Sequence, residues 1–531
     1  MRVPSNPVAN QIASGNKPER LEWFRDLGLG LFIHWGIDVQ LGGDISHPLV
    51  GASDDFVERY YDELPRRFHP RRFDPVEWAE LASLIGVRYV VFTTKHHSGF
   101  CMFETATTPR HVVNTPFGRD ATAEILDAFR HEGIAAGVYF SPDDFAWLRE
   151  NGIPIQRTIP EVQPWSNPGL MELSRTQVTE LLTKYGDVDL IFFDGDADGL
   201  REHAWATDPE IVVTRGALPT PEQHIPGQSI EGAWESNLTM GTQWTYKPTN
   251  ETYKSGSRLI EILIETRAKG GNLLLNIGPK ADGTIPVEQE ARLQELGLWM
   301  FVNREAIYAT RPWVVTNEGG LWFTRAKDED TLYVAVVGGE RWAWGERREF
   351  LIRSARATER TEVAVLGQNG EIMEYRPDAD PAPRWEQTDD GLAISAYNAQ
   401  RLYNDKKWPN PVVLRITHVE PAAEPARVET VDATWSPETS TVDVTIEVQQ
   451  TGGAETILVG AEYQDITGMD TMERPDGWTP TPLKAATGTV HASFPTEPGR
   501  VLAVRALGRT DLFDVRGREI KLATVDSRAE H

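Results

Sequence analysis

The chain has 531 residues, with 53 Lys and Arg against 79 Asp and Glu, so its formal net charge is −26. This charge argues against nucleic acid and anionic membrane surfaces as partners, because both are bound through basic side chains. The single cysteine, Cys101, excludes an internal disulfide framework, and no apolar run approaches the ~18 residues of a membrane span. No apolar leader opens the chain, so we expect a cytoplasmic protein of about two to four domains.

Residues from about 20 to 310 alternate short apolar strands with helical patterns. Asp74 and Pro75 are typical of a helix start, and apolar residues then recur at helical spacing up to Ile85. The candidate strands are, in chain order, 29–33, 89–94, 135–140, 190–193, 210–213, a weak one near Ser229, and 272–276. Nearly continuous apolar strands between helices indicate a parallel sheet covered on both faces. We therefore expect an α/β fold, a (β/α)8-like (TIM) barrel with one strand obscured, and a doubly wound open sheet is the alternative.

The pattern changes at Trp313, where strands that alternate or are β-branched follow one another with turn residues between them. This arrangement is typical of antiparallel β-sandwich domains. We expect the barrel to occupy residues 1–312, a β-sandwich domain residues 313–420, and a second, C-terminal β-sandwich-like domain residues 421–531. A Pro/Ala-rich stretch at 419–427 is interpreted as the linker between the two β-domains.

Polar residues follow several of the predicted barrel strands, where the catalytic residues of such barrels lie. They are His34, Lys95, His96, His97, Tyr139, Asp194, Arg215, Glu222 and Glu235. Neighbours on a regular strand face opposite ways, so His96 and His97 reach one pocket together only if the chain has left the ladder there. Carboxylates combined with hydroxyl-binding His and Arg side chains are typical of glycoside hydrolysis.

Two possible metal sites are alternatives to this hypothesis. The run from Asp194 to Gly199 matches the start of a calcium loop, but position twelve of that loop is Trp205 instead of Glu. A zinc site formed by His34, His96 and His97 lacks the spacing of a known motif. We therefore predict no metal, with the zinc site kept as the less favoured alternative.

Several sequence blocks carry a resemblance to a known family. They are 30–36 (GLFIHWG), 73–79 (FDPVEWA), 95–100 (KHHSGF), 139–142 (YFSP), 193–195 (FDG), 220–223 (TPEQ), 234–235 (WE) and 269–279 (KGGNLLLNIGP). In this order they resemble glycoside hydrolase family 29, the retaining α-L-fucosidases, over roughly residues 20–420. The resemblance implies a barrel followed by a β-sandwich, exo-acting hydrolysis of terminal α-L-fucosyl residues, and a fucosylated oligosaccharide as the partner.

The resemblance also implies roles for individual residues. Asp194 matches the nucleophile and Glu222 the acid/base, with Glu235 as the reserve acid/base. The remaining positions, which would bind the sugar or support the nucleophile, are His34, Glu58, His96, His97, Tyr139, Phe192, Arg215, Trp234 and Glu235. The family needs no cofactor, and the resemblance leaves the oligomeric state open.

The chain departs from the family at two positions beside the expected sugar pocket. Arg59 stands where the family often has an aromatic residue, and Phe192 stands where it often has Trp. One hypothesis is that Arg59 faces an anionic group, such as a sulfate, and the alternative is that it is a surface residue. A related α-glycosidase acting on an α-L-galactoside or on an anionic fucoside, and a carbohydrate-binding protein without activity, therefore remain as alternatives.

Overall fold

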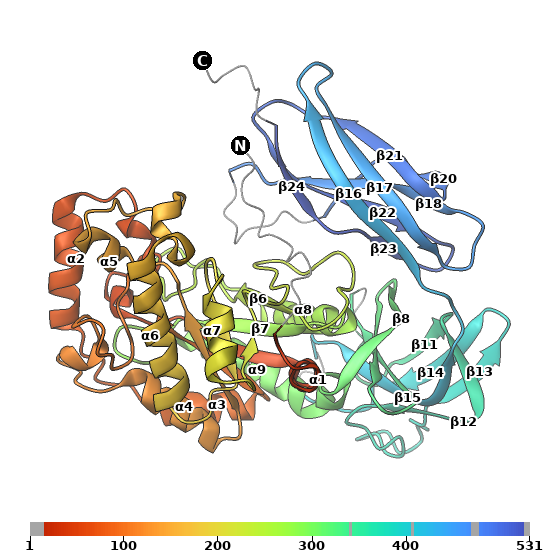
Figure 1. The fold of residues 1–531 in the computed structure, drawn as a ribbon. Helices are drawn as coiled ribbons and strands as arrows, with labels where there is room; N and C mark the ends of the chain where they lie inside the picture. Colours follow the sequence, from red (N-terminus) through yellow and green to blue (C-terminus); the bar gives the residue numbers. More distant parts are fainter. Residues whose placement is uncertain (1–14, 339–341, 405–407, 469–476, 525–531) are drawn as a thin grey trace.

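The structure is a computed structural model that describes residues 15–338, 342–404, 408–468 and 477–524. Figure 1 shows three parts in chain order: an α/β part in red to green, a β part in green to cyan, and a second β part in blue. The first part contains a parallel sheet and carries the candidate site. The other two parts are built from antiparallel sheets, as predicted.

The α/β part is built on a seven-stranded sheet in the order β5-β4-β3-β2-β1-β7-β6, in which every pairing is parallel. The strands are β1 (Leu29–Ile33), β2 (Tyr89–Lys95), β3 (Ala135–Phe140), β4 (Leu190–Phe193), β5 (Val212–Val213), β6 (Glu235–Thr239) and β7 (Asn272–Ile277). The barrel-like parallel sheet is confirmed, but within the described ranges β5 and β6 are not paired with each other, so the sheet is open there. The weak strand expected near Ser229 is wrong, because the sixth strand begins at Glu235.

The helices of this part lie mainly between consecutive strands. They are α1 (Pro18–Leu27), α2 (Asp54–Arg67), α3 (Pro75–Leu84), α4 (Ala121–His131), α5 (Phe145–Glu150), α6 (Pro168–Lys184), α7 (Leu200–Thr207), α8 (Gly256–Ala268) and α9 (Val287–Asn303). Asp74 caps α3 as predicted, since its carboxylate accepts from the backbone N–H groups of Val76 and Glu77. Among the helices of the described ranges, none combines the length and the apolar character needed to cross a bilayer.

The inside of the curled sheet is filled by side chains rather than left as a channel. Phe32, Tyr89, Phe192 and Leu274 come from four different strands and are each at most 1% exposed. Inward-pointing residues of parallel barrel strands pack in this way and close the interior. A pocket can therefore form only above this filling, at the carboxyl ends of the strands.

The two C-terminal parts are each made of two sheets. The first holds the orders β12-β15-β10-β9-β8 and β11-β14-β13, and the second holds β16-β17-β21 and a sheet around β18 and β22. The strands are β8 (Thr310–Glu318), β9 (Leu321–Ala326), β10 (Thr331–Val336), β11 (Arg347–Ile352), β12 (Ala355–Val365), β13 (Arg384–Thr388), β14 (Gly391–Tyr397), β15 (Val412–Pro421), β16 (Ala426–Ser436), β17 (Thr441–Thr451), β18 (Ile457–Asp465), β19 (Thr479–Pro480), β20 (Lys484–Ala486), β21 (Gly488–Pro495), β22 (Val501–Arg509), β23 (Asp514–Arg516) and β24 (Ile520–Ala523). The predicted linker 419–427 is shorter than expected, because β15 continues to Pro421 and β16 begins at Ala426.

The loop 214–234 connects β5 to β6 on the open side of the sheet, and its outer part contacts the last β-part. Gln228 Nε2 donates a hydrogen bond to Glu429 Oε2 over 2.9 Å. A Cβ atom on Gly227 would lie 2.7 Å from the carbonyl oxygen of Gly517, so the backbones approach closely at a position where only glycine fits. The last β-part therefore packs against this loop of the α/β part and supports it.

Candidate active site

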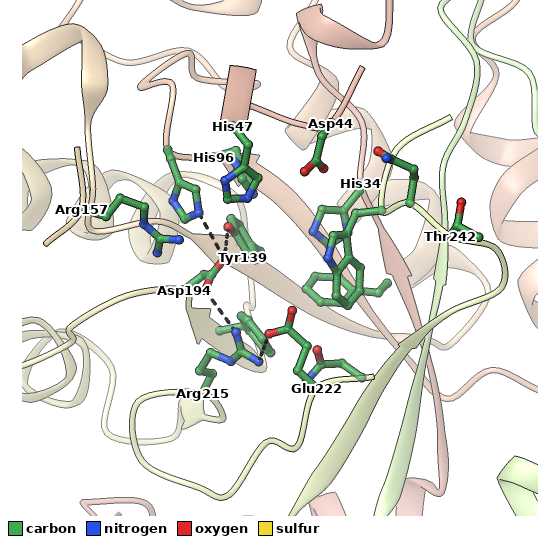
Figure 2. Close-up of a pocket in the computed structure, with 16 residues that line it drawn as sticks. His34, Asp44, His47, His96, Tyr139, Arg157, Asp194, Arg215, Glu222 and Thr242 are labelled. Atoms are coloured by element: carbon green, nitrogen blue, oxygen red, sulfur yellow. Dashed lines mark hydrogen bonds and ion pairs between the residues drawn. The ribbon is translucent and has the colours of Figure 1, made fainter. Parts of the chain in front are cut away.

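A pocket of about 300 Å³ lies at the carboxyl ends of the parallel strands, and Figure 2 shows side chains converging on it. Eight of the residues expected from the sequence line it: His34, His96, His97, Tyr139, Phe192, Asp194, Arg215 and Glu222. They lie in the last two residues of β1 to β5 or in the two residues that follow these strands, apart from Glu222, which lies in the loop from β5 to β6. The volume is at the small end for ligand sites and suits a ligand of about one sugar ring.

His96 and His97 both face the pocket because the chain has left the sheet where they occur. The pairing of β2 with β3 shifts register between Thr93 and Lys95, and β2 ends at Lys95. The two imidazole rings then lie 4.0 Å apart, centre to centre. Because β2 ends one residue before His96, the two histidines are not bound by the alternation of a strand, and both side chains reach the same pocket.

Asp194 is surrounded by donors and cations. Its Oδ2 accepts a hydrogen bond from the Tyr139 hydroxyl at 2.7 Å, and its Oδ1 accepts one from Arg215 Nη1 at 3.1 Å. His97 Nε2 lies 3.6 Å from Oδ2. Burial alone would raise the pKa of Asp194, but His97, Arg215 and Arg157 lower it well below its ordinary value. Asp194 is thus held as a carboxylate directed into the pocket.

The residue after Asp194 must be glycine. Gly195 has a φ of 148°, and a Cβ atom there would lie 3.1 Å from Cδ of Pro142. This backbone geometry is open to glycine and strained for other residues. It lets the chain turn away immediately after the carboxylate has been placed at the end of β4.

Arg215 joins the two candidate catalytic carboxylates. Its Nη2 donates to Glu222 Oε2 at 2.8 Å, while Nη1 bonds to Asp194, and Figure 2 shows the guanidinium between the two. The guanidinium also lies 4.7 Å from the centre of the Phe192 ring. Burial would lower the pKa of Arg215, but Glu222 and Asp194 raise it above its ordinary value, so it stays a cation. One charged group therefore holds both acids toward the same small space.

Glu222 is positioned by the strand that follows its loop. The backbone N–H of Gln223 donates to the carbonyl of Asn237 at 2.9 Å, and the N–H of Asn237 donates to the carbonyl of Pro221 at 3.0 Å. These bonds attach the residues on either side of Glu222 to β6. The carboxylate consequently projects from a fixed backbone rather than from a free loop.

The three predicted sugar-binding histidines are buried and neutral. Burial lowers the pKa of His34 to about 4, although Asn276, whose Oδ1 lies 2.6 Å from His34 Nδ1, opposes this. Burial also brings the pKa values of His96 and His97 well below the ordinary value. A neutral imidazole has one N–H donor and one lone-pair acceptor, so each ring can pair with a sugar hydroxyl.

Trp234 and Glu235 do not reach the pocket. Glu235 is the first residue of β6 rather than a residue after a strand, and it pairs with Asn272 at the opposite end of the sheet. It is fully buried, and the Tyr89 hydroxyl donates to its Oε2 at 2.8 Å. Trp234 packs against Gly271, where a Cβ atom would lie 2.5 Å from its ring. The prediction that these two residues contact the substrate is therefore corrected: both side chains lie in the barrel interior.

Glu58, Arg59 and Lys95 also lie outside the pocket lining. Glu58 and Arg59 are exposed because the buried face of α2 is formed by other residues, at positions 57, 60 and 64. Arg59 forms an ion pair with Asp55, one helical turn away, so the hypothesis that it faces an anionic sugar group is wrong. Lys95 points away from the pocket and is paired with Asp144 at 3.3 Å.

Further lining residues were not found by sequence reasoning: Phe32, Asp44, His47, Arg157, Asn237, Thr242, Gln243 and Trp244. Trp244 adds an aromatic wall, since its ring lies 4.9 Å from the His34 ring. Arg157 is held by Asp143, which accepts a 2.6 Å hydrogen bond from its Nε. Trp244 was missed because the polar sequence of β6 does not resemble a strand, so the loop that follows this strand was not recognised either.

His96, His97 and Asp194 form the one group in the described ranges whose atoms are arranged as potential metal ligands, all within 4.8 Å. Both oxygens of Asp194 already accept hydrogen bonds, and two guanidinium groups face this carboxylate. Their positive charge opposes the binding of a dication at the same place. This arrangement suits an ionised carboxylate poised for reaction.

We expect the protein to lose stability as the pH falls from about 6.5 to 4.5. Unfolding lets His34, His96 and His97 each bind a proton that the folded state excludes in this range. Glu235 opposes them, because burial raises its pKa to about 7 in the folded state, despite the Tyr89 hydrogen bond. On unfolding, the three histidines gain three protons and Glu235 loses one, so these four groups take up about two protons. Each proton taken up lowers the free energy of unfolding by about 1.4 kcal/mol for every unit by which the pH falls.

Thermal unfolding at several pH values, together with the proton uptake on unfolding, measures this dependence. A transition temperature that stays constant between pH 6.5 and 5 would contradict the prediction. The sign follows from linkage, since stability falls toward acid wherever the unfolded chain binds more protons.

Comparisons with known proteins agree with this geometry. The family model described as α-L-fucosidase matches residues 3–305. The plasma α-L-fucosidase of Rattus norvegicus is 28% identical over 407 residues, which cover 65% of this chain and 82% of the relative. The α-L-fucosidase of Dictyostelium discoideum is 28% identical over 411 residues, which cover 69% and 86%.

A solved structure shares the fold. It is the trapped covalent intermediate of an α-L-fucosidase from Bacteroides thetaiotaomicron, which superposes with a TM-score of 0.60 at 22% identity. The match covers 77% of this chain and 97% of the other. The family model spans more than half of the chain, and its residues include the whole pocket. The chain therefore belongs to the α-L-fucosidase family of glycoside hydrolases.

Proposed function

We propose that this protein is an exo-acting retaining α-L-fucosidase that releases terminal α-L-fucosyl residues from oligosaccharides or glycoconjugates. The observation that carries the proposal is the pair of carboxylates, Asp194 and Glu222, held toward one small pocket by Arg215. Retaining glycosidases need two such groups on the two sides of the scissile bond. Neutral histidines and the Trp244 ring supply hydroxyl contacts and an apolar wall around them.

In the first step Asp194 attacks the anomeric carbon and forms a fucosyl ester, while the bond to the leaving oxygen breaks. Glu222 gives its proton to that oxygen, which departs as an alcohol. The low pKa of Asp194 keeps the nucleophile ionised across the physiological range. The Tyr139 and Arg215 hydrogen bonds hold its two oxygens in a defined orientation.

In the second step Glu222 acts as a base, takes a proton from water, and the hydroxide attacks the anomeric carbon. The ester bond breaks, and Asp194 is released as a carboxylate. Arg215 holds this carboxylate toward the pocket, because its Nη2 donates a hydrogen bond to Glu222 Oε2. Two displacements at one carbon restore its original configuration.

The alternatives differ in their demands on the pocket. A carbohydrate-binding protein without activity needs no nucleophile, whereas Asp194 is present with a low pKa and accepts hydrogen bonds from Tyr139 and Arg215. An anionic fucoside is disfavoured, because the residue proposed to meet it, Arg59, is on the surface. An α-L-galactoside is the alternative substrate that the experiment below tests directly. A cytoplasmic location stays a prediction from the sequence.

A panel of aryl α-L-fucoside, α-L-galactoside and other aryl glycosides tests the function, with proton NMR of the first sugar released. We expect the α-L-fucoside to be hydrolysed fastest and the α-anomer to appear first. Release of the β-anomer would reject the double displacement, and hydrolysis of the galactoside alone would reject the fucoside as the substrate.

A further inference from the structure

The segment from the end of η1 (Ile37–Gln40) to the first residue of η2 (His47–Leu49) presents two ionisable side chains to the pocket that the proposed reaction does not use. They are Asp44 and His47. Figure 2 shows both on the far side of the pocket from Arg215 and Glu222, with the Asp44 carboxylate beside the open space. The imidazole of His47 lies 5.5 Å from that of His97, centre to centre.

This segment is held in a strained conformation by buried hydrogen bonds. Ser46 is fully buried and has a φ of 58°, a left-handed conformation that is costly for a residue with a side chain. Its backbone N–H donates to Asp38 Oδ2 at 2.9 Å, and the Tyr60 hydroxyl donates to the same oxygen at 3.0 Å. Its hydroxyl lies 2.9 Å from His96 Nδ1. The network that orients His96 therefore also fixes the segment that carries Asp44 and His47.

The other side of the segment is fixed by the loop that follows β6. The Thr245 hydroxyl donates to the carbonyl of Gly43 at 3.0 Å. A Cβ atom on Gly42 would lie 2.4 Å from Cδ of the Pro248 ring, so the Gly42 backbone packs directly on that ring. Asp44 is thus presented by a segment anchored at both ends, as is typical of a binding residue.

The charge of the pocket limits what Asp44 can accept. Asp44, Asp194 and Glu222 place three carboxyl groups around about 300 Å³. A carboxylate pairs well with a hydroxyl donor, whereas a sulfate or uronate beside it would be repelled. Glu58, the carboxyl group expected to bind the sugar, is exposed on α2 and outside the lining. Among the described residues, Asp44 is therefore the one carboxyl group of the pocket lining besides the two catalytic ones.

We propose that Asp44 accepts a hydrogen bond from the 3- or 4-hydroxyl of the sugar, and that it restricts the pocket to glycons on which this hydroxyl is free and neutral. The inference rests on the proposed fucosidase function and assigns a specificity residue to it. The 2-hydroxyl lies next to the anomeric carbon, and hence near Asp194, so the more distant hydroxyls are the ones available to Asp44. His47 flanks the same side of the sugar.

The proposal is tested by a cycle of protein and substrate changes. Values of kcat/KM are measured for nitrophenyl α-L-fucoside and its 3-deoxy and 4-deoxy analogues, with wild type and Asp44→Asn. Loss of one charged hydrogen bond is expected to reduce kcat/KM about 10- to 150-fold, whether the hydroxyl or the carboxylate is removed. For the correct deoxy sugar the two losses should not add, because the second change has nothing left to remove.

The matched control is Asp55→Asn, which removes the same charge from the exposed face of α2. It should leave all three kcat/KM values within about twofold of wild type, as expected for a surface change. Within one variant, the ratio between parent and deoxy substrate does not depend on the fraction of folded protein. A folding defect in Asp44→Asn therefore cannot mimic the expected result.

A second arm uses the 3-sulfated and 4-sulfated aryl fucosides, which wild type should reject and Asp44→Asn should hydrolyse better relative to the parent. If wild type fails to hydrolyse the parent fucoside, the proposed function fails before any variant is compared. If wild type is active, but Asp44→Asn is equally active or its losses add for both deoxy sugars, the assignment of Asp44 alone is overturned.

Discussion

Replacing Asp194 by glycine is expected to reduce hydrolysis of aryl α-L-fucosides on the order of 10⁴-fold or more, the scale seen when a catalytic nucleophile is removed. The variant lacks the group that forms the covalent intermediate, while Tyr139 and Arg215 lose the carboxylate they orient. Steady-state kcat and KM, together with the thermal transition, measure the effect and show whether the fold is kept.

Azide distinguishes this loss from simple damage. A small anion can enter the space left by the carboxylate and attack from the same side, which should restore turnover and give β-L-fucosyl azide. The matched control is Asp196→Gly, two residues further on, where the side chain is exposed and outside the pocket lining. Full activity of Asp194→Gly without azide would reject Asp194 as the nucleophile.

Replacing Glu222 by alanine is expected to reduce kcat/KM about 10²- to 10⁴-fold for fucosides with poor leaving groups, because general acid catalysis is lost. A nitrophenolate departs without a proton, so activated aryl fucosides should lose much less in their first step. A series of aryl fucosides with leaving groups of increasing pKa measures this, and the variant should show the steeper dependence.

Azide again gives an independent readout. It should accelerate the second step of Glu222→Ala and give α-L-fucosyl azide, the opposite anomer from that of the nucleophile variant. Glu231→Ala, in the same loop but exposed and outside the pocket lining, is the matched control. An unchanged dependence on the leaving group would reject Glu222 as the acid/base.

The strands that carry the nucleophile and the histidines could be recognised because they are apolar along their whole length and end abruptly in polar residues. Val90 to Phe92 and Leu190 to Phe193 are fully or almost fully buried, as strands of a parallel sheet covered on both sides must be. The position of a polar residue after such a strand is therefore readable without knowledge of the fold.

The sixth strand was misplaced because its residues contradict its environment. Glu235, Ser236, Asn237 and Thr239 are all buried in β6, with Leu238 as the only apolar residue of the five. Their burial is decided by pairing with β7 and by contacts such as that of Tyr89, which no local pattern reports. The error moved Glu235 to the wrong end of the sheet and hid Trp244.

The misplacement of Glu58 and the omission of Asp44 have different causes. The positions of α2 that are buried, 57, 60 and 64, have helical spacing, so the sequence did contain a signal that Glu58 faces outward. Asp44 and Arg157 lie in irregular segments without a repeat. Their placement depends on Ser46 and Asp143, that is, on contacts made only in the folded chain.

The unpaired side of the sheet has a consequence for how the protein is made. Gly227 meets Gly517, which is 517 − 227 = 290 residues later in the chain. At about 5–20 residues per second, a ribosome needs roughly 15 to 60 s to reach that residue. Throughout this interval the loop that carries Glu222 lacks its outer support, although every pocket-lining residue of the described chain precedes position 245. We expect the emerging barrel to be vulnerable to proteases at this loop until the last β-part has been synthesised and has docked.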